Sequence, residues 1–414
     1  MPRALRCARH ATAMALVAAA TMVAPLNGVS ATPSGESETT EGFDPVLARS
    51  IKSSTSEESG YHSCATRTDR TLWCWGSNHR GEIGDGTTTN RLTPTRVGTA
   101  ENWVAVAVGS AHTCAVRAGG SLWCWGWNHA GQLGDDTTRD RDRPQRVGTA
   151  TGWAGVAAGS GHTCAIRRNG ALWCWGYNGH GQVGDGTTTD RHTPQRVGTA
   201  GGWVTVSAGR NHTCATRSSG ALWCWGYNYA GQIGDGTTTE RLRPTRVGTS
   251  TKWTTVTVGY WHTCATRNSG TLWCWGYNFA GQIGDGTTTA RHHPRRVGTA
   301  ASWESVSAAA AHTCALTTKG IRWCWGANWH GQIGDGTTTD RHSPKRVGTT
   351  RHWVSVHAGD GHTCATRANG ALRCWGRNDD GRLGDGTLVD RHHPTRVGTD
   401  ADWAGTAAVY ATTA

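Results

Sequence analysis

The sequence lacks several features that would assign it to a common class of protein. Beyond its N-terminal segment it has no uninterrupted run of the roughly 18 apolar residues that a membrane-spanning helix needs, so we expect no transmembrane helix. Hydrophobic residues make up only 36% and charged residues 17% of the 414 residues. The chain nevertheless contains 23 tryptophans, and this content argues against intrinsic disorder over most of its length.

Motifs for metal binding and for catalysis are also missing. No Cys-x-x-Cys pair occurs, which argues against a four-cysteine zinc site. The recurring Gly-Asp-Gly-Thr segments lack the alternating acids and terminal Glu of an EF-hand calcium loop, and an Asp bonded to its own turn explains them better. We therefore predict no metal site, no cofactor and no catalytic residues, and we expect that the protein is not an enzyme.

The N-terminal part of the chain differs in composition from the rest. Three arginines among the first nine residues precede an apolar stretch and a small-residue site that ends at Ala31, which is the pattern of a secretory signal peptide. We expect residues 1–31 to be this signal and residues 32–60 to be a flexible acidic linker rich in Ser, Thr and Glu. Residues 61–414 would then form the folded domain of a secreted, extracellular protein.

From residue 51 onward the chain repeats every 50 residues. Seven blocks align without an insertion, beginning at residues 51, 101, 151, 201, 251, 301 and 351. In the second block, residues 103–108, 112–117 and 121–125 predict three short strands, and a Pro-x-Arg-Val segment predicts a fourth that starts at the proline. Four short strands repeated seven times describe an all-β, seven-bladed β-propeller.

The two ends of the repeat region complement each other. The first block has Ser53 where the other blocks have Trp, whereas Trp403 restarts the pattern after the seventh block. We therefore expect residues 401–409 to supply the inner strand of the first blade. Such sharing closes the ring and removes an open sheet edge.

Fourteen cysteines recur at two positions in each block. An even number of cysteines in an exported protein favours disulfides. If Arg117 faces Ser121 across the hairpin loop, then Cys114 faces Cys124 at a narrow pair with Cα atoms ~4.5 Å apart, which is within disulfide range. We predict seven bridges: Cys64–Cys74, Cys114–Cys124, Cys164–Cys174, Cys214–Cys224, Cys264–Cys274, Cys314–Cys324 and Cys364–Cys374.

The shared pattern H-T-C-A-x-R-x-x-G-x-L-W-C-W-G-x-N-x-x-G-Q-x-G-D-G resembles the repeat of the regulator-of-chromosome-condensation family. The resemblance covers nearly all of residues 60–414 and implies a seven-bladed propeller. The founding member is a nuclear nucleotide-exchange factor that binds nucleosomes, with a blade insertion and a basic tail that serve these roles. Here the repeats are of equal length, the linker is acidic and an export signal is expected, so secreted bacterial members are closer in setting, among them a β-lactamase-inhibitory protein with a similar seven-bladed architecture.

Two further sets of polar residues recur with the repeat. The seven histidines from His62 to His362 are expected to bond to neighbouring backbone within each blade. Arginines such as Arg91 and Arg96 account for much of the net charge of +12, and they are spread evenly around the ring. We therefore expect no specific nucleic-acid partner.

Positions at which the repeats differ are the candidates for function. Outside three periodic Trp columns, ten aromatic residues occupy only four of the fifty repeat positions: Tyr61, Trp127, Tyr177, Tyr227, Tyr229, Tyr260, Trp261, Tyr277, Phe279 and Trp329. These positions fall in the first-to-second and third-to-fourth strand connections, which open on the same face of a propeller. The last nine aromatics, together with Asp360 and Asp379 in a charged sector beside them, are our predicted binding residues.

Three classes of function fit this pattern. We favour a protein-binding propeller, with inhibition of the partner as one outcome, because Tyr and Trp offer large rigid contact areas and the loops differ from blade to blade. A carbohydrate or cell-wall binder is the alternative, and an enzyme built on Asp360, Asp379, Asp380 and His330 is a third interpretation. The aromatics could instead cap their own blades. We predict a monomer with an extracellular protein partner or a glycan ligand, and no membrane partner.

Overall fold

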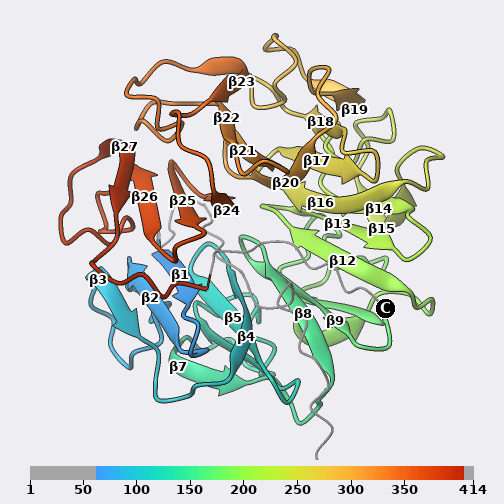
Figure 1. The fold of residues 1–414 in the computed structure, drawn as a ribbon. Helices are drawn as coiled ribbons and strands as arrows, with labels where there is room; N and C mark the ends of the chain where they lie inside the picture. The colour runs from blue at the N-terminus through green and yellow to red at the C-terminus, as the bar shows by residue number, and fades with distance from the viewer. Residues whose placement is uncertain (1–61, 405–414) are drawn as a thin grey trace, which may run out of the picture. The chain divides into compact units, whose positions relative to one another are not determined.

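The computed structural model describes residues 62–404, which form seven antiparallel sheets arranged in a ring as a β-propeller (Figure 1). The expected signal peptide, the linker, Tyr61 and residues 405–414 lie outside the described residues. Within the described part of the chain, no helix is present that could traverse a bilayer. The prediction of a seven-bladed all-β propeller is confirmed.

Each block forms one blade, numbered here in block order, with its strands hydrogen-bonded in sequence order. The inner strands are β4 (Trp103–Val108), β8 (Trp153–Ala158), β12 (Trp203–Ala208), β16 (Trp253–Val258), β20 (Trp303–Ala308) and β24 (Trp353–Ala358). The second strands are β1 (His62–Thr66), β5 (His112–Arg117), β9 (His162–Arg167), β13 (His212–Arg217), β17 (His262–Arg267), β21 (His312–Thr317) and β25 (His362–Arg367). Inner strands of neighbouring blades contact one another.

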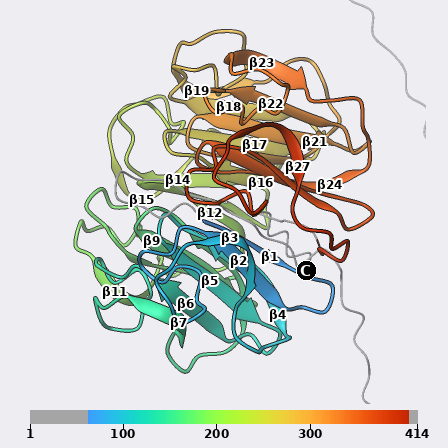
Figure 2. The same cartoon turned by 90° about the vertical axis from the view of Figure 1, so that its left-hand side faces the viewer.

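The third and fourth strands complete each blade toward the outside of the ring. The third strands are β2 (Leu72–Gly76), β6 (Leu122–Gly126), β10 (Leu172–Gly176), β14 (Leu222–Gly226), β18 (Leu272–Gly276), β22 (Arg322–Gly326) and β26 (Leu372–Gly376). The outer strands are β3 (Arg91–Arg96), β7 (Arg141–Arg146), β11 (Arg191–Arg196), β15 (Arg241–Arg246), β19 (Arg291–Arg296), β23 (Arg341–Arg346) and β27 (Arg391–Arg396). The order β1, β2, β3 within the first sheet can be followed in Figure 2.

The outer strand differs from its prediction in one respect. It begins three residues before the proline, so that Pro94 lies inside β3 instead of at its start. The register between β2 and β3 skips from Cys74–Thr95 to Gly76–Arg91, which is a bulge that takes Pro94 out of the ladder. Because β3 is also an edge strand, the missing N–H of the proline costs no ladder hydrogen bond.

The predicted cysteine pairs are all present as disulfides. In the second blade Cys114 faces Cys124 with Cα atoms 4.1 Å apart, and the hairpin closes through Arg117 N–H donating to Ser121 O. The same bridge, with a sequence separation of 10, recurs in every blade. Each disulfide therefore joins the second and third strands of one blade, and none of the seven links two blades.

The hydrophobic core lies between blades. Leu122 of one blade packs with Trp153 and Trp175 of the next, and six further clusters lie at the other interfaces of the ring. The Trp175 indole also donates a hydrogen bond of 2.9 Å to Gln132 O of the preceding blade. Gly134 permits this approach, because a Cβ there would lie 2.6 Å from Trp175 Nε1. Tryptophan thus supplies both apolar area and a polar contact at this interface.

The seven repeated histidines also connect each blade to the next. His112 Nε2 lies 2.9 Å from Thr163 Oγ1, and this hydroxyl donates to Gln132 O at 2.8 Å. Because the hydroxyl hydrogen is used by the carbonyl, the imidazole donates from Nε2. The expectation of a backbone partner is wrong at this nitrogen, since the ring reaches across the blade interface to a side chain, but His362 does have a backbone neighbour in its own blade, with Nδ1 3.3 Å from Asp360 O. The equivalent pairs are His62–Thr113, His162–Thr213, His212–Thr263, His262–Thr313 and His312–Thr363, with His362–Ser63 at the closure.

The ring closes where blade 7 meets blade 1. Trp403 forms an antiparallel bridge with Arg67, and Ala404 N–H donates to Thr66 O at 3.1 Å. Trp403 is buried, with its ring 5.9 Å from that of Trp75. The start of the predicted shared strand is therefore in place, and its remaining residues lie outside the described range.

Replacing Trp403 with Ala tests the shared blade. The change removes a buried indole from the closing interface, so we expect the free energy of unfolding to fall by about 3–5 kcal/mol in chemical denaturation. Trp329→Ala is the matched control, because Trp329 is 56% exposed and its loss should change stability by no more than about 0.5 kcal/mol. Equal effects of the two substitutions would contradict the closure.

The buried histidines predict how stability depends on pH. Burial lowers the pKa of His112 to about 3 and, with the neighbouring His262 and His162, lowers the pKa of His212 to about 3 as well. Between the ordinary pKa of 6.5 and pH 3 the unfolded chain therefore binds protons that the folded chain does not. The free energy of unfolding is therefore at its full value above this window. It decreases as the pH falls through the window, with a slope of about 1.4 kcal/mol per pH unit for each such histidine.

Urea unfolding between about pH 6 and pH 4.5 measures this slope. His212→Gln should make the pH dependence shallower by the contribution of one histidine. His192→Gln, at an exposed position, is the control and should leave the slope unchanged. If the His212→Gln protein keeps the slope of the unsubstituted protein, the buried histidine is not held neutral.

Candidate binding face

Two loops of each blade lie side by side at one end of the propeller. In blade 5 the first loop, between β16 and β17, carries Tyr260 and Trp261, and the second loop, after β18, begins with Tyr277. Tyr277 N–H donates to Trp261 O at 2.8 Å and joins the two loops. The aromatic positions singled out in the sequence therefore lie at the same end of each blade.

The second loop is fixed by its own side chains. In blade 2, Asn128 Oδ1 accepts Leu133 N–H at 3.0 Å, while its Nδ2 donates to the carbonyls of Thr137 and Arg139. Asp135 accepts both the N–H and the hydroxyl of Thr137, as the interpretation of an Asp bonded to its own turn requires. A loop held in this way can vary its outward side chains without losing its shape.

An arginine completes the same loop in every blade. Asp135 pairs with Arg141 at 2.7 Å, and burial alone would raise the pKa of this Asp, but Thr137 and Arg141 hold it below its ordinary value. The equivalent pairs are Asp85–Arg91, Asp185–Arg191, Asp235–Arg241, Asp285–Arg291, Asp335–Arg341 and Asp385–Arg391. One recurring arginine per blade is thus neutralised locally, which reduces the charge available to a nucleic acid.

The first group of aromatics extends over blades 3 to 5. The ring of Trp261 meets that of Tyr227 edge-on at 5.4 Å, and Tyr227 lies 4.8 Å from His180. His180 in turn is 6.2 Å from Tyr177, and Tyr229 stacks beside Tyr227 at 6.4 Å with 77% of its surface exposed. We call this set the aromatic arc: Tyr177, His180, Tyr227, Tyr229, Tyr260 and Trp261.

The remaining aromatics lie in neighbouring loops. Phe279 packs against Tyr277 at 5.2 Å and against Trp329 of the next blade at 5.7 Å. Trp127 stacks on His129 at 6.3 Å. Although Tyr277 and Trp261 belong to one blade, Trp261 packs on the preceding blade and the Tyr277–Phe279 pair packs on the following one. The aromatic contacts therefore run across blade interfaces.

His180 and Arg210 belong to this face, although neither was among the predicted binding residues. The Arg210 guanidinium lies 5.3 Å from the ring of Tyr260 and 5.1 Å from that of Trp261, within cation–π distance. Arg210 occupies the repeat position that holds Tyr260 and Asp360 in other blades, so its departure from the repeat was a usable signal. His180 also pairs with Glu240 of blade 4 at 2.7 Å.

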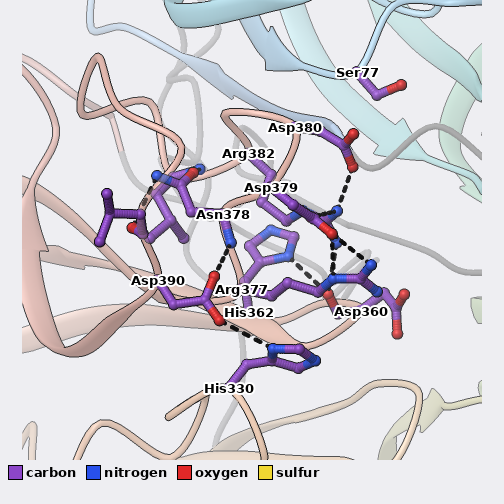
Figure 3. A network of polar contacts seen from close by, with 12 residues as sticks. Ser77, His330, Asp360, His362, Arg377, Asn378, Asp379, Asp380, Arg382 and Asp390 are labelled. Carbon is purple, nitrogen blue, oxygen red and sulfur yellow. Dashed lines mark hydrogen bonds and ion pairs between the residues drawn. The ribbon is translucent and has the colours of Figure 1, made fainter.

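Blade 7 carries the charged sector (Figure 3). Asp379 pairs with Arg377 and with Arg382, each at 2.5 Å, and Asp380 also contacts Arg382. Burial would raise the pKa of Asp379, but Arg382 and Arg377 hold it below its ordinary value. Asp360 contributes its carbonyl, which accepts from Arg382 Nη1 at 3.2 Å. Arginine side chains thus organise this sector.

His330 does not pair with Asp360, Asp379 or Asp380, the acids considered with it as catalytic residues. Its Nδ1 is 3.0 Å from Asp390, whose other oxygen accepts the Asn378 N–H. His330 therefore has Asp390 as its ion-pair partner, although it also lies close enough to Asp379 to lower the pKa of that carboxyl. Arg382, which was not among the predicted residues, is fully buried in a repeat position that holds glutamine in five other blades.

A narrow cavity opens next to the arc, between the ends of the inner strands. Its volume is about 40 Å³, and small residues such as Ala208, Gly209 and Ala308 line it together with Arg210 and Tyr260. Pockets for small molecules usually enclose roughly 300–1,000 Å³. This part of the face therefore offers a ligand a surface and not a deep pocket.

The fold and these loops define a β-propeller with a variable face. Models of the regulator of chromosome condensation (RCC1) repeat match residues 70–116, 119–166, 169–216, 219–266, 269–316, 319–366 and 369–407. The chain belongs to the RCC1 repeat family.

Solved structures show the same fold at low sequence identity. Prp20p of Saccharomyces cerevisiae, reported with its binding properties to Gsp1p and histones, is 21% identical with a TM-score of 0.73, over 82% of this chain and 88% of that one. Human WBSCR16 is also 21% identical with a TM-score of 0.72, over 80% of this chain and 94% of that one. Yeast Prp20 bound to Kap60 gives 20% identity and a TM-score of 0.73, over 90% of this chain and 92% of that one. No curated protein sequence matches the chain.

The contacts between aromatic side chains predict that replacing two neighbouring tyrosines has unequal effects on stability. Tyr227 touches three other rings and is half-buried, so Tyr227→Ala should lower the unfolding free energy by about 1–3 kcal/mol. Tyr229→Ala should change it by no more than about 0.5 kcal/mol, because most of this side chain is in solvent. Thermal and urea unfolding of the two variants checks this, and the reverse order would contradict the contacts.

Proposed function

We propose that the protein is a secreted propeller that binds an extracellular protein through the aromatic arc and the aromatics in the neighbouring loops. The observation that carries this proposal is that exposed aromatic side chains gather on one face although the repeat does not require them. Tyr229 is 77% exposed and Trp329 is 56% exposed, so neither side chain is fully used in packing its own blade. Tyrosine and tryptophan at such sites are the usual anchors of protein–protein interfaces.

The unequal composition of the face favours one protein partner over a repeated small ligand. The arc joins rings from blades 3, 4 and 5, whereas blade 7 presents Arg377 and Asp379 at the equivalent loop positions. An apolar sector and a charged sector on one face suit a single partner of matching chemistry. Seven similar glycan sites would instead require seven similar loops.

The geometry of the acids supports binding over catalysis. Asp379 and Asp380 are paired with arginines, and His330 is paired with Asp390. Arg382 and Arg377 hold the pKa of Asp379 below its ordinary value, so this carboxyl is poorly suited to act as a general acid or base near neutral pH. The similar Prp20p is reported with its binding to Gsp1p and histones, which is consistent with a role in protein contacts.

Secretion is part of the same proposal. Seven disulfides within the described residues are typical of proteins that fold in an oxidising compartment. The N-terminal sequence adds the pattern of a signal peptide. These two observations are independent, because the disulfides lie in the repeats and the signal pattern lies outside them.

Affinity capture from culture medium tests the binding face. We expect the unsubstituted propeller to retain a protein that the double variant Tyr229→Ala/Trp329→Ala fails to retain, with a loss of about 2 kcal/mol or more per side chain once the affinity is measured. Val354→Ala is the matched control, because Val354 is 45% exposed at the opposite end of an inner strand. It should leave capture unchanged.

The melting temperature of each bait protein separates binding from folding. Lost capture with an unchanged melting temperature supports the proposal, whereas a lower melting temperature with unchanged capture would show that these aromatics serve the scaffold. A glycan array probed with the same baits distinguishes the carbohydrate alternative. Retention of a polysaccharide by the unsubstituted bait, without any protein, would overturn the choice of a protein partner.

A further inference from the structure

Three arginines converge in a groove between blades 6 and 7. The groove has a volume of about 320 Å³, and Arg322, Arg367 and Arg373 line it together with Trp353 and His393. None of the three arginines belongs to the candidate binding face. The groove is therefore a separate feature of the propeller.

Two of these arginines replace apolar residues of the repeat. The position of Arg322 holds a fully buried leucine in the other six blades: Leu72, Leu122, Leu172, Leu222, Leu272 and Leu372. The position of Arg373 holds tryptophan in the other six: Trp73, Trp123, Trp173, Trp223, Trp273 and Trp323. Both arginines line one groove. The interface between blades 6 and 7, which we call a seam of the ring, therefore carries two more positive charges than the repeat would give it.

Arg322 occupies an apolar site in which two of its own nitrogen atoms lack a hydrogen-bond partner. It is 2% exposed, and its guanidinium carbon lies 4.4 Å from the Trp353 ring and 4.2 Å from the Trp375 ring. Within residues 62–404, its Nε and Nη1 have no hydrogen-bond partner. Burial first, and then the nearby Arg367 and Arg373, lower the pKa of this guanidinium to about 9. The tryptophan faces offset only part of the cost of burying such a charge.

The positive charge in the groove is not balanced by carboxylates of the described residues. In that part of the chain, Arg322, Arg367 and Arg373 form no ion pair, and Asp335, which also lines the groove, is already paired with Arg341. Arg373 also faces another arginine, Arg396, directly across the β26–β27 ladder, which is an unfavourable like-charge pair. The groove therefore holds an excess of positive charge.

The next seam of the ring shows how such an arginine is compensated elsewhere. Arg67, which corresponds to Arg367, pairs with Asp400 at 2.5 Å and with Asp402 at 3.5 Å. The positions that correspond to these two acids hold Thr350 and His352 in the loop before β24. The chain thus supplies acids at these positions only where blade 7 meets blade 1, and the interface between blades 6 and 7, like the others, has none there although it carries two additional arginines.

We propose that the groove between blades 6 and 7 binds an oxyanion of the phosphate or sulfate class. Arg367 and Arg373 line its wall, and a guanidinium group matches the oxygens of such an anion with two parallel donors. Arg322 supplies a buried positive charge beside them, in a place where the repeat would put leucine. The bound anion takes the role that Asp400 and Asp402 play beside Arg67.

Isothermal titration with inorganic phosphate tests the site, with sodium chloride at equal ionic strength as the reference. The double variant Arg322→Leu/Arg373→Trp restores the residues of the other blades, so it should fold, and its affinity for phosphate should fall at least tenfold. The Arg322→Leu protein should also melt at a higher temperature without phosphate, because it no longer buries an unpaired charge. The single variant Arg373→Trp provides the same binding test if the double variant does not fold.

Arg217→Thr is the control for the loss of one positive charge, and it matches the single variant Arg373→Trp in net charge. Arg217 occupies the position of Arg367 in blade 4, and blade 6 already has Thr317 there, so the substitution is compatible with the repeat. Its affinity for phosphate should equal that of the unsubstituted protein. The proposal is overturned if the unsubstituted protein binds phosphate no better than chloride, or if the restored variants bind it as tightly as the unsubstituted protein does. Sulfate, titrated in parallel, should compete with phosphate for the same site.

Discussion

Besides its apolar cluster, each interface between two blades is organised around one buried backbone carbonyl. In blade 2 the Gln132 carbonyl accepts hydrogen bonds from the Thr163 hydroxyl and the Trp175 indole of blade 3, and Thr163 in turn accepts from His112. Buried groups of this kind are costly to leave unsatisfied, because no water can replace a lost partner. Gln132 belongs to the second loop of its blade, so the contact that joins two blades also fixes the loop that carries the proposed recognition residues.

This arrangement separates the residues that hold the ring from those that can vary. Asn128 and Asp135 fix the second loop from inside, through bonds that do not use the variable side chains on either side of Asn128. Positions such as those of Tyr229 and Trp329 are left outside this network and are exposed. The loops can therefore change their chemistry from blade to blade while the interfaces stay the same.

Much of the fold could be predicted from the sequence because it is a local property of one block. The hairpin register that places Cys114 opposite Cys124 follows from counting residues, and the disulfides confirm it. The bulge around Pro94 was missed, because the proline alone does not show where the ladder skips residues. The existence of the strand was predictable, but its start was not.

The parts that could not be predicted involve contacts between blocks. The partner of His112 is Thr163 of the next blade, and the neighbours of Arg322 are tryptophans of the next blade. The departure of Arg322 from the repeat is visible in the sequence, but its burial between two indoles requires the three-dimensional packing. For Arg382, likewise, the sequence showed a change of residue without showing which acids it would meet.

The seam between blades 7 and 1 differs from the other six in the length of chain that it closes. His112 and Thr163 are 51 residues apart, whereas Ser63 and His362 are 299 apart, and the disulfides lie within blades and cannot hold this seam. Closing it costs more chain entropy than closing any other interface. The Arg382 carbonyl accepts from Ser63 and Trp75 here, while its side chain holds the acids of the charged sector. A ligand that contacted both blades would hold this interface closed, because its binding free energy would add to the stability of the closed ring.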